Sequence, residues 1–348
     1  MSHGFFVAAN WQRYGTIIEI SMNSKKPRTT AGAALPEPTT TEYSKTPEKP
    51  RINTVDGFIA AAQSKATKRA YANDVQHYLQ HGGSIPSTGA MVADYLAKFA
   101  ATLKVATLER RCIAIHNAHI GQGLASPIKG SAIVKSTMNG IRRTMGTRQR
   151  AVKPVTKDVL LEMLVTLDKR KPLKAARDKA LLLVGFAGAF RRSELVALHV
   201  EDLTVDDAGA MVLLRFSKTD QLGKGRTVFL PRASDAERCP VQSLLDWLQL
   251  AGIESGWLVR SVRKGGGSVS DKPLSTQSVA QIIKRATKAA GRESTEFSGH
   301  SLRAGYVTTA AIVGLQPYQI REQTGHKSDA TLARYIRPVE KRRIPSLL

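Results

Sequence analysis

Cysteine is nearly absent from this sequence of 348 residues, which contains only Cys112 and Cys239, far apart and in unrelated surroundings. Two such cysteines provide neither a disulfide framework nor the ligand spacing of a zinc site, so a reducing, intracellular compartment is expected. The sequence also lacks a constellation of aspartate and glutamate residues that resembles a two-metal nuclease. We therefore expect no metal ion and no other cofactor.

Apolar runs of membrane length are missing as well. The longest run, residues 180–190, is too short to span a bilayer and predicts a buried helix or strand. The first twenty residues have no basic segment ahead of their apolar ones, so a secretory signal is not expected. Met22 could equally be the first translated residue, which leaves open whether residues 1–21 are made. No membrane partner is expected.

Acidic residues are scarce relative to basic ones. There are 52 lysines and arginines against 28 aspartates and glutamates, which gives a formal net charge of +24. A net charge of about 2–8 is enough to keep a small domain in solution, so this excess indicates a large polyanionic partner. Nucleic acid is the preferred interpretation over a membrane surface. Apolar residues make up 42% of the chain, which predicts a globular protein.

Composition and periodicity divide the chain into four parts. Residues 1–53 are unpatterned or rich in proline, threonine, lysine and glutamate, and they predict a flexible tail. Residues 54–146 show helical periodicity and predict a helical domain with its own core. Residues 147–154 (TRQRAVKP) predict a linker, because they have little apolar content and end in proline. Residues 155–348 mix helix and strand patterns and end in a basic tail.

The local patterns also predict individual elements. In the first domain, helices are expected over residues 65–81, from a cap at Ser87, from Thr107 and over residues 131–145. In the second, helices are expected over residues 157–167, 175–190, 240–251 and 276–290, and from about Ser193. Strands are expected over residues 199–205, 211–217 and 226–230, with a hairpin loop at residues 219–225. Residues 260–272 predict a basic, glycine-rich loop.

Basic side chains of the helical domain and linker are candidates for contact with DNA. Any one of them could equally lie on a solvated face, but a set of them in so basic a chain favours contact with phosphates. The predicted DNA-binding residues are Lys65, Lys68, Arg69, Arg110, Arg111, Arg142, Arg143, Arg148 and Arg150.

The segment over residues 298–335 contains most of the candidate catalytic groups. His300 and Arg303 stand three residues apart and would share a face of a helix. His326 follows a glycine that predicts the end of a helix, and Tyr335 lies nine residues further along. Guanidinium, imidazole and phenol groups together suit the attack of a tyrosine oxygen on a phosphodiester whose oxygens are held by positive charge.

This order of H-x-x-R, G-H and a tyrosine nine residues later resembles the tyrosine recombinase (phage integrase) family. The family also has an arginine in an R-x-[SAT]-E-[LI] context and a lysine on a β-hairpin, which residues 189–195 (AFRRSEL) and 216–220 (FSKTD) match. The resemblance covers roughly residues 54–335. It implies a multidomain, Cre-like recombinase with an all-α core-binding (SAM-like) N-terminal domain. The second domain would be a mixed α+β catalytic domain with a small antiparallel sheet.

Chemistry and the resemblance together assign roles to the candidate residues. Arg191 and Arg303 would each donate two hydrogen bonds to the non-bridging phosphate oxygens, and Glu194 would orient Arg191. His300 is the preferred general base for the tyrosine proton, and both it and His326 are expected to hydrogen-bond the phosphate.

Two further roles rest on the resemblance. Tyr335 is the expected nucleophile, singled out by its nine-residue step from the second histidine. Lys218 is the expected general acid for the departing 5′ oxygen, and Lys224 in the same loop is its rival.

The resemblance implies a site-specific recombinase that cleaves and rejoins double-stranded DNA, for integration or excision. The reaction would pass through a 3′-phosphotyrosyl intermediate and a Holliday junction, without metal or ATP. Expected partners are duplex DNA with an inverted-repeat site and further copies of the chain in a tetramer, while the free protein would be a monomer or weak oligomer. A cytoplasmic location is expected, with the nucleoid if the source is bacterial.

Two alternatives to recombination remain at this point. A type IB topoisomerase would use the same chemistry without pairing two sites. A DNA-binding regulator would have lost catalysis, but competent residues fill all six candidate catalytic positions, which argues against it.

Overall fold

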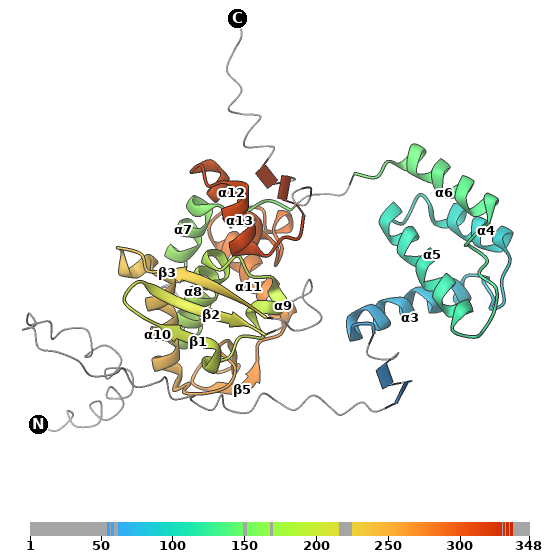
Figure 1. The fold of residues 1–348 in the computed structure, drawn as a ribbon. Coiled ribbons are helices and arrows are strands. Elements are labelled where there is room, and N and C mark those ends of the chain that lie inside the picture. The colour runs from blue at the N-terminus through green and yellow to red at the C-terminus, as the bar shows by residue number, and fades with distance from the viewer. Residues whose placement is uncertain are drawn as a thin grey trace, which may run out of the picture. The chain divides into compact units, whose positions relative to one another are not determined.

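The computed structural model describes residues 54–55, 57–58, 62–148, 152–167, 170–215, 225–328, 330, 332–333 and 335–336. Their contacts form two compact units, one before and one after residues 149–151 (Figure 1). The predicted tail over residues 1–53 lies outside the described residues, as does part of the predicted linker. Within the described parts, no helix is both long and apolar enough to cross a membrane.

The first unit is built from helices α3 (Lys65–Gln80), α4 (Gly89–Phe99), α5 (Val105–Ile120) and α6 (Ala132–Met145). Apolar residues spaced along each helix meet in one core, which includes Tyr78, Leu96, Leu108 and Ile115. Hydroxyl side chains begin three of the helices, because their oxygens accept hydrogen bonds from backbone N–H groups that the first turn leaves unpaired.

Helix α4 begins one residue later than expected. The predicted cap, Ser87, is occupied elsewhere: its hydroxyl bonds to the Tyr78 hydroxyl and its backbone N donates to His119 Nε2 at 3.0 Å. Thr88 takes the capping position and accepts from Met91 N at 3.3 Å. The start of α5 at Val105 is two residues earlier than the predicted start at Thr107, and no side chain caps it.

The second unit contains helices and two small antiparallel sheets. Its helices are α7 (Lys157–Val165), α8 (Pro172–Ala187), α9 (Arg192–Leu195), α10 (Pro240–Ala251), α11 (Thr276–Ala289), α12 (Ser301–Ile312) and α13 (Pro317–Thr324). Its strands are β1 (Leu203–Val205), β2 (Gly209–Leu214) and β3 (Arg226–Pro231) in one sheet, and β4 (Arg260–Val262) and β5 (Val269–Pro273) in the other.

Helix α8 lies at the centre of this unit. It packs against α10, α12 and β3, so that the three-stranded sheet lies across α8 and α10 (Figure 1). Leu181, Leu182 and Val184 of α8 are buried, and they join a core that includes Trp247 of α10. Because α8 is anchored on several sides, the residues at its carboxyl end are held in fixed positions relative to α12 and β3.

Two predictions about strands were wrong in this unit. Residues 260–272 were expected to be a loop, but they form most of the β4–β5 hairpin, with a left-handed Gly266 (φ +78°) in its turn. The Lys171 ammonium supports this turn by donating to the Gly265 carbonyl at 2.7 Å. The strand expected over residues 199–205 is shorter than predicted, because Val200–Asp202 form a 3₁₀ turn before β1.

Candidate active site

A strained turn follows α8 and leads to Arg191. The helix ends at Ala187, and Ala189 adopts a φ of +47°, a left-handed conformation that is unfavourable for a residue with a side chain. The Ala189 carbonyl accepts a hydrogen bond from Arg303 Nη1 at 2.7 Å. The turn is therefore held by a side chain from α12, more than a hundred residues later.

Glu194 holds Arg191 in place through two contacts. Its Oε2 accepts from the Arg191 backbone N at 2.8 Å, and its Oε1 accepts from Arg191 Nη1 at 2.5 Å. The Glu194 side chain is 1% exposed and that of Arg191 is 12% exposed. A carboxylate this deeply buried needs its cationic partner, so the pair orients the guanidinium and leaves its other N–H groups for a ligand.

Arg303 lies in the first turn of α12 and is buried. Burial, followed by repulsion from Arg191, lowers the pKa of its guanidinium to about 10, so it remains protonated at neutral pH. Helix α12 passes so close to Val155 that a Cβ on Gly305 would lie 1.6 Å from the Val155 carbonyl oxygen. Glycine at this position therefore sets the depth of Arg303 in the unit.

His326 follows the end of α13, where Gly325 turns the chain with a φ of +65°. Thr324 Oγ1 donates to the Ile320 carbonyl at 2.6 Å, so it can only accept from His326 Nδ1, which lies 2.8 Å away. His326 Nε2 lies 3.2 Å from Arg303 Nη2, and a guanidinium can only donate. The neutral imidazole therefore has its proton on Nδ1, with the Nε2 lone pair facing Arg303.

The electrostatics around His326 favour this neutral form. Burial, and then the charges of Arg303, Arg191 and Arg226, lower its pKa from 6.5 to about 4. At neutral pH the imidazole is uncharged and hydrogen-bonded on both nitrogens.

Tyr335 lies beside this cluster. Its ring centroid is 6.4 Å from that of His326, with the two ring planes at 38°. The tyrosine is partly buried against an apolar cluster that includes Val307 and Ile320. Burial has the largest effect on the pKa of Arg303 and lowers it, whereas the electrostatic interaction with Tyr335 raises it by a smaller amount. The phenol is thus near the buried arginine and the imidazole.

Arg226, the first residue of β3, was not identified from the sequence. Its Nη1 donates to the Gln323 carbonyl at 3.0 Å, and its Nη2 lies 3.9 Å from Glu194 Oε2. A lone arginine at the start of a strand has no sequence signal of its own. The one hint is its place in the sequence shortly after both candidate lysines, Lys218 and Lys224.

The remaining candidates for catalysis are placed as follows. His300 is the N-cap residue of α12 and is exposed, and its backbone N donates to Ser298 Oγ at 3.1 Å. Lys218 and Lys224 lie within residues 216–224, outside the described residues. Their assigned roles stay predictions.

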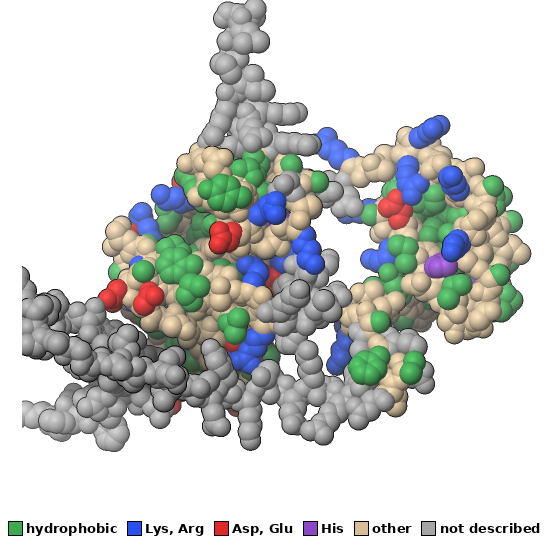
Figure 2. All heavy atoms as spheres, in the orientation of Figure 1, with side chains coloured by type: hydrophobic (Ala, Val, Ile, Leu, Met, Phe, Trp, Pro, Cys, Tyr) green, Lys and Arg blue, Asp and Glu red, His purple; other side chains and the backbone are tan. Residues whose placement is uncertain are grey.

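The candidate DNA-binding residues of the first unit differ in accessibility. Figure 2 shows several lysine and arginine side chains on the visible face of this unit. Lys65, Lys68, Arg69, Arg110, Arg142, Arg143 and Arg148 are exposed. Arg150 lies outside the described residues.

Three of these arginines have partners within the protein. Arg110 makes two hydrogen bonds to the buried Asp74, at 2.7 and 2.9 Å, and Arg142 donates to Glu109 at 2.9 Å. Arg111 is itself buried, and its Nη1 donates to the Tyr95 hydroxyl at 2.6 Å. A buried guanidinium with internal partners supports the helical core, which disfavours direct contact of Arg111 with DNA.

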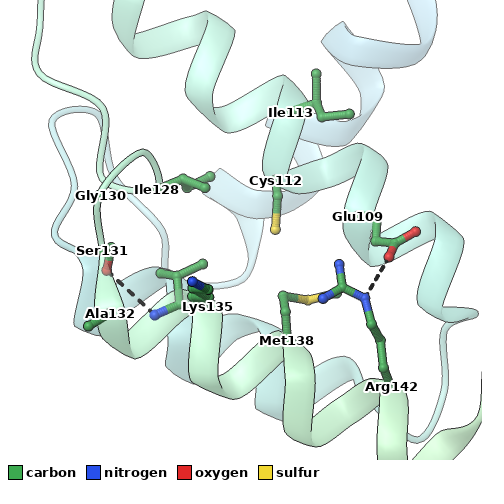
Figure 3. A pocket seen from close by; sticks show the side chains of 11 residues that line it. Glu109, Cys112, Ile113, Ile128, Gly130, Ser131, Ala132, Lys135, Met138 and Arg142 are labelled. Carbon is green, nitrogen blue, oxygen red and sulfur yellow. Dashed lines mark hydrogen bonds and ion pairs between the residues drawn. The ribbon is translucent and has the colours of Figure 1, made fainter.

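A hollow of about 830 Å³ lies between α5 and α6 (Figure 3). Its walls are largely apolar, with Cys112, Ile113 and Met138 among them, and the Glu109–Arg142 ion pair lies at one side. Burial raises the pKa of the Cys112 thiol to about 11, so this cysteine is not a nucleophile at neutral pH. Among the described residues, no group of three or more histidine, cysteine or acidic residues could hold a metal ion.

Comparison with known proteins adds to this geometry. Residues 153–342 match the phage integrase family. The chain is similar to an integrase/recombinase xerD homologue from Selenomonas ruminantium, at 38% identity over 284 residues, covering 79% of this chain and 82% of the relative.

Two solved structures share the fold. One is the XerH site-specific recombinase bound to a palindromic difH substrate in a post-cleavage complex (20% identity, TM-score 0.56, covering 74% of this chain and 70% of that chain). The other is a lambda integrase tetramer bound to a Holliday junction (17% identity, TM-score 0.54, covering 80% and 74%). At these identities the likeness concerns the fold alone.

Proposed function

Because this chain belongs to the phage integrase family, whose tyrosine recombinases act on DNA, we propose that it cleaves and rejoins double-stranded DNA at specific sites with Tyr335 as the nucleophile. The observation that carries this proposal is the meeting of Arg191, Arg303, His326 and Tyr335 from separate segments of the chain. These groups are the ones that phosphodiester cleavage by a phenol requires.

The charge of the cluster supports this reaction. Arg191, Arg226 and Arg303 supply three positive charges and Glu194 removes one, so the described groups have a net charge of +2 while His326 is neutral. A phosphodiester under attack by a phenolate carries two negative charges in all. A buried cluster with the opposite charge stabilises this transition state more than water does, because its dipoles and charges are already oriented.

The proposed cleavage forms one bond and breaks one. Tyr335 Oη loses its proton and attacks phosphorus, forming the 3′-phosphotyrosyl bond, while the bond from phosphorus to the 5′ oxygen breaks. His300 is the proposed acceptor of the phenol proton, and Lys218 the proposed donor to the 5′ oxygen, with Lys224 as the alternative. Rejoining reverses these steps with another 5′ hydroxyl and needs neither ATP nor a metal ion.

The tautomer of His326 adds a step before cleavage. Its Nε2 accepts from Arg303, so this nitrogen has no proton to donate to a phosphate oxygen. An entering phosphate brings a negative charge that raises the pKa of the imidazole. We infer that His326 takes up a proton at Nε2 when the scissile phosphate binds, and then donates to a non-bridging oxygen.

The proposed assembly follows the solved relatives. XerH was solved on a palindromic substrate, and lambda integrase as a tetramer on a Holliday junction. We propose that this chain likewise acts on an inverted-repeat site as a tetramer, through a Holliday junction. The exposed basic side chains of the helical unit would contact the phosphates.

A nicked suicide substrate tests the proposal. Cleavage next to the nick releases a short fragment, so the covalent protein–DNA adduct accumulates and can be seen on a denaturing gel. Tyr335→Phe must abolish the adduct, whereas Tyr306→Phe, which removes a hydroxyl from another tyrosine of the same unit, should keep it. The adduct should also form in the presence of a chelator. An adduct that persists in Tyr335→Phe would refute the assignment.

A second substrate distinguishes the proposed recombinase from a topoisomerase. A recombinase exchanges strands between two copies of its site, and a topoisomerase relaxes supercoiled plasmid that contains no site. Relaxation without exchange would favour the topoisomerase.

A further inference from the structure

Arg226 holds the end of α13. Its Nη1 donates to the Gln323 carbonyl at 3.0 Å, and its Nη2 lies 3.4 Å from the Thr324 carbonyl. These are the last two carbonyls of the helix, which have no N–H partner in a following turn. A cation at this position satisfies them and interacts favourably with the negative end of the helix dipole.

The same side chain lies against the turn that precedes His326. A Cβ on Gly325 would come within 2.8 Å of Arg226 Nε, and the φ of +65° is itself unfavourable for other residues. Gly325 thus allows the guanidinium to come close to the backbone that leads into His326.

The guanidinium of Arg226 is directed towards the backbone. Its Nη1 donates to the Gln323 carbonyl and its Nη2 faces the Thr324 carbonyl. Its remaining neighbour, Glu194, is already bound to Arg191. Arg191 differs, because its described hydrogen bonds run to the Glu194 carboxylate and not to backbone carbonyls.

We propose that Arg226 is a positioning residue, which clamps the turn over residues 324–326 to strand β3 and thereby holds His326 at the scissile phosphate. Because Arg226 is the first residue of β3, the clamp ties the start of this strand to the histidine. The expected effect of the clamp on DNA cleavage rests on the proposed function, whereas the clamp itself consists of contacts within the protein.

The charge of Arg226 has a separate effect on His326. It is the last of the influences that lower the pKa of the imidazole, after burial, Arg303 and Arg191. Other groups near the imidazole are Tyr335, and Tyr318, Arg321 and Glu322, which line a hollow with it. A neutral residue at position 226 should therefore raise the pKa of His326, whereas lysine should leave the charge in place.

Two variants separate the clamp from the charge. Arg226→Lys keeps the charge and loses the fork that reaches two carbonyls, while Arg226→Gln loses both. Arg232→Gln is the matched control, because Arg232 follows the other end of β3 and also donates to a carbonyl, that of Asp206, at 3.2 Å. Thermal unfolding and circular dichroism establish that each variant is folded.

The DNA-free protein gives the first readout. Hydrogen exchange of the amides over residues 321–328 should accelerate in both Arg226 variants and not in the control. In ¹⁵N-histidine NMR spectra, the pKa of His326 should rise in Arg226→Gln and stay near the wild-type value in Arg226→Lys.

Cleavage gives the second readout. At saturating suicide substrate, we expect adduct formation to slow by about 10²-fold in both variants, because a displaced catalytic group costs rate rather than affinity. Arg232→Gln should react like the wild type. Unchanged exchange over residues 321–328, or a loss that appears only as weaker DNA binding, would overturn the clamp. Should the wild type form no adduct, the proposed function fails, and hydrogen exchange still decides the clamp.

Discussion

The ionisation of His326 gives a quantitative prediction about stability. Its pKa is about 4 in the folded protein, because burial and then Arg303, Arg191 and Arg226 disfavour the charged form, and it is 6.5 in the absence of these effects. Well above pH 6.5 the imidazole is neutral in both states and adds no pH dependence. As the pH falls from 6.5 towards 4, the unfolded chain binds the proton first, so the free energy of unfolding decreases.

The size of this decrease follows from the two pKa values. At about 1.36 kcal/mol for each pKa unit, the difference between 6.5 and about 4 corresponds to about 3 kcal/mol. The loss should be nearly complete at pH 4 and constant well below it. His326→Gln removes the titration, so the stability difference between the wild type and this variant should shrink, or reverse, by about 3 kcal/mol between pH 7.5 and pH 4.

Urea unfolding followed by tryptophan fluorescence measures this difference. Of the three tryptophans, Trp247 is fully buried in the second unit, Trp257 belongs to the same unit, and Trp11 lies outside the described residues. Residues 62–148 of the first unit contain none, so Trp11→Phe leaves a signal that reports the unit that contains His326. Measurement at pH 8, where the imidazole is neutral in both states, supplies the reference. A stability difference that stays constant from pH 8 to pH 4 would refute the low pKa of His326.

Two further substitutions test the framework of the site by the same unfolding assay, together with adduct formation. Glu194→Gln should lower the free energy of unfolding by about 3–5 kcal/mol, because the partly buried guanidinium groups of Arg191 and Arg226 lose their buried carboxylate partner; a change near zero would contradict a stabilising role of these ion pairs. Gly305→Ala should cost at least about 1–3 kcal/mol and slow adduct formation, because the new Cβ would overlap the Val155 carbonyl and move α12. Gly140→Ala, a helical glycine with open space around it, should be neutral or stabilising, and an equal cost at both positions would show that the contact with Val155 is not the cause.

Much of the local structure could be predicted from the sequence, because it depends on neighbouring residues. Helix α10 covers residues 240–251 as expected, since Pro240 stands at its first position and Gly252 ends it in a left-handed conformation. The family assignment was likewise confirmed, because order and spacing of the motifs are properties of the chain itself. The helix expected to continue to residue 190 shows the limit: α8 ends at Ala187, and the turn at Ala189 is held by Arg303.

Only the tertiary structure decided which segments that are distant in the chain contact one another. The sequence places Arg226 at the start of a strand, but only the fold brings it onto the carbonyls of α13. In the same way, Arg111 is of a residue type that commonly contacts DNA, but the fold buries its side chain within the first unit. Periodicity and capping act over a few residues and can be recognised in the sequence, whereas the partner of a buried charge depends on how whole helices and strands pack.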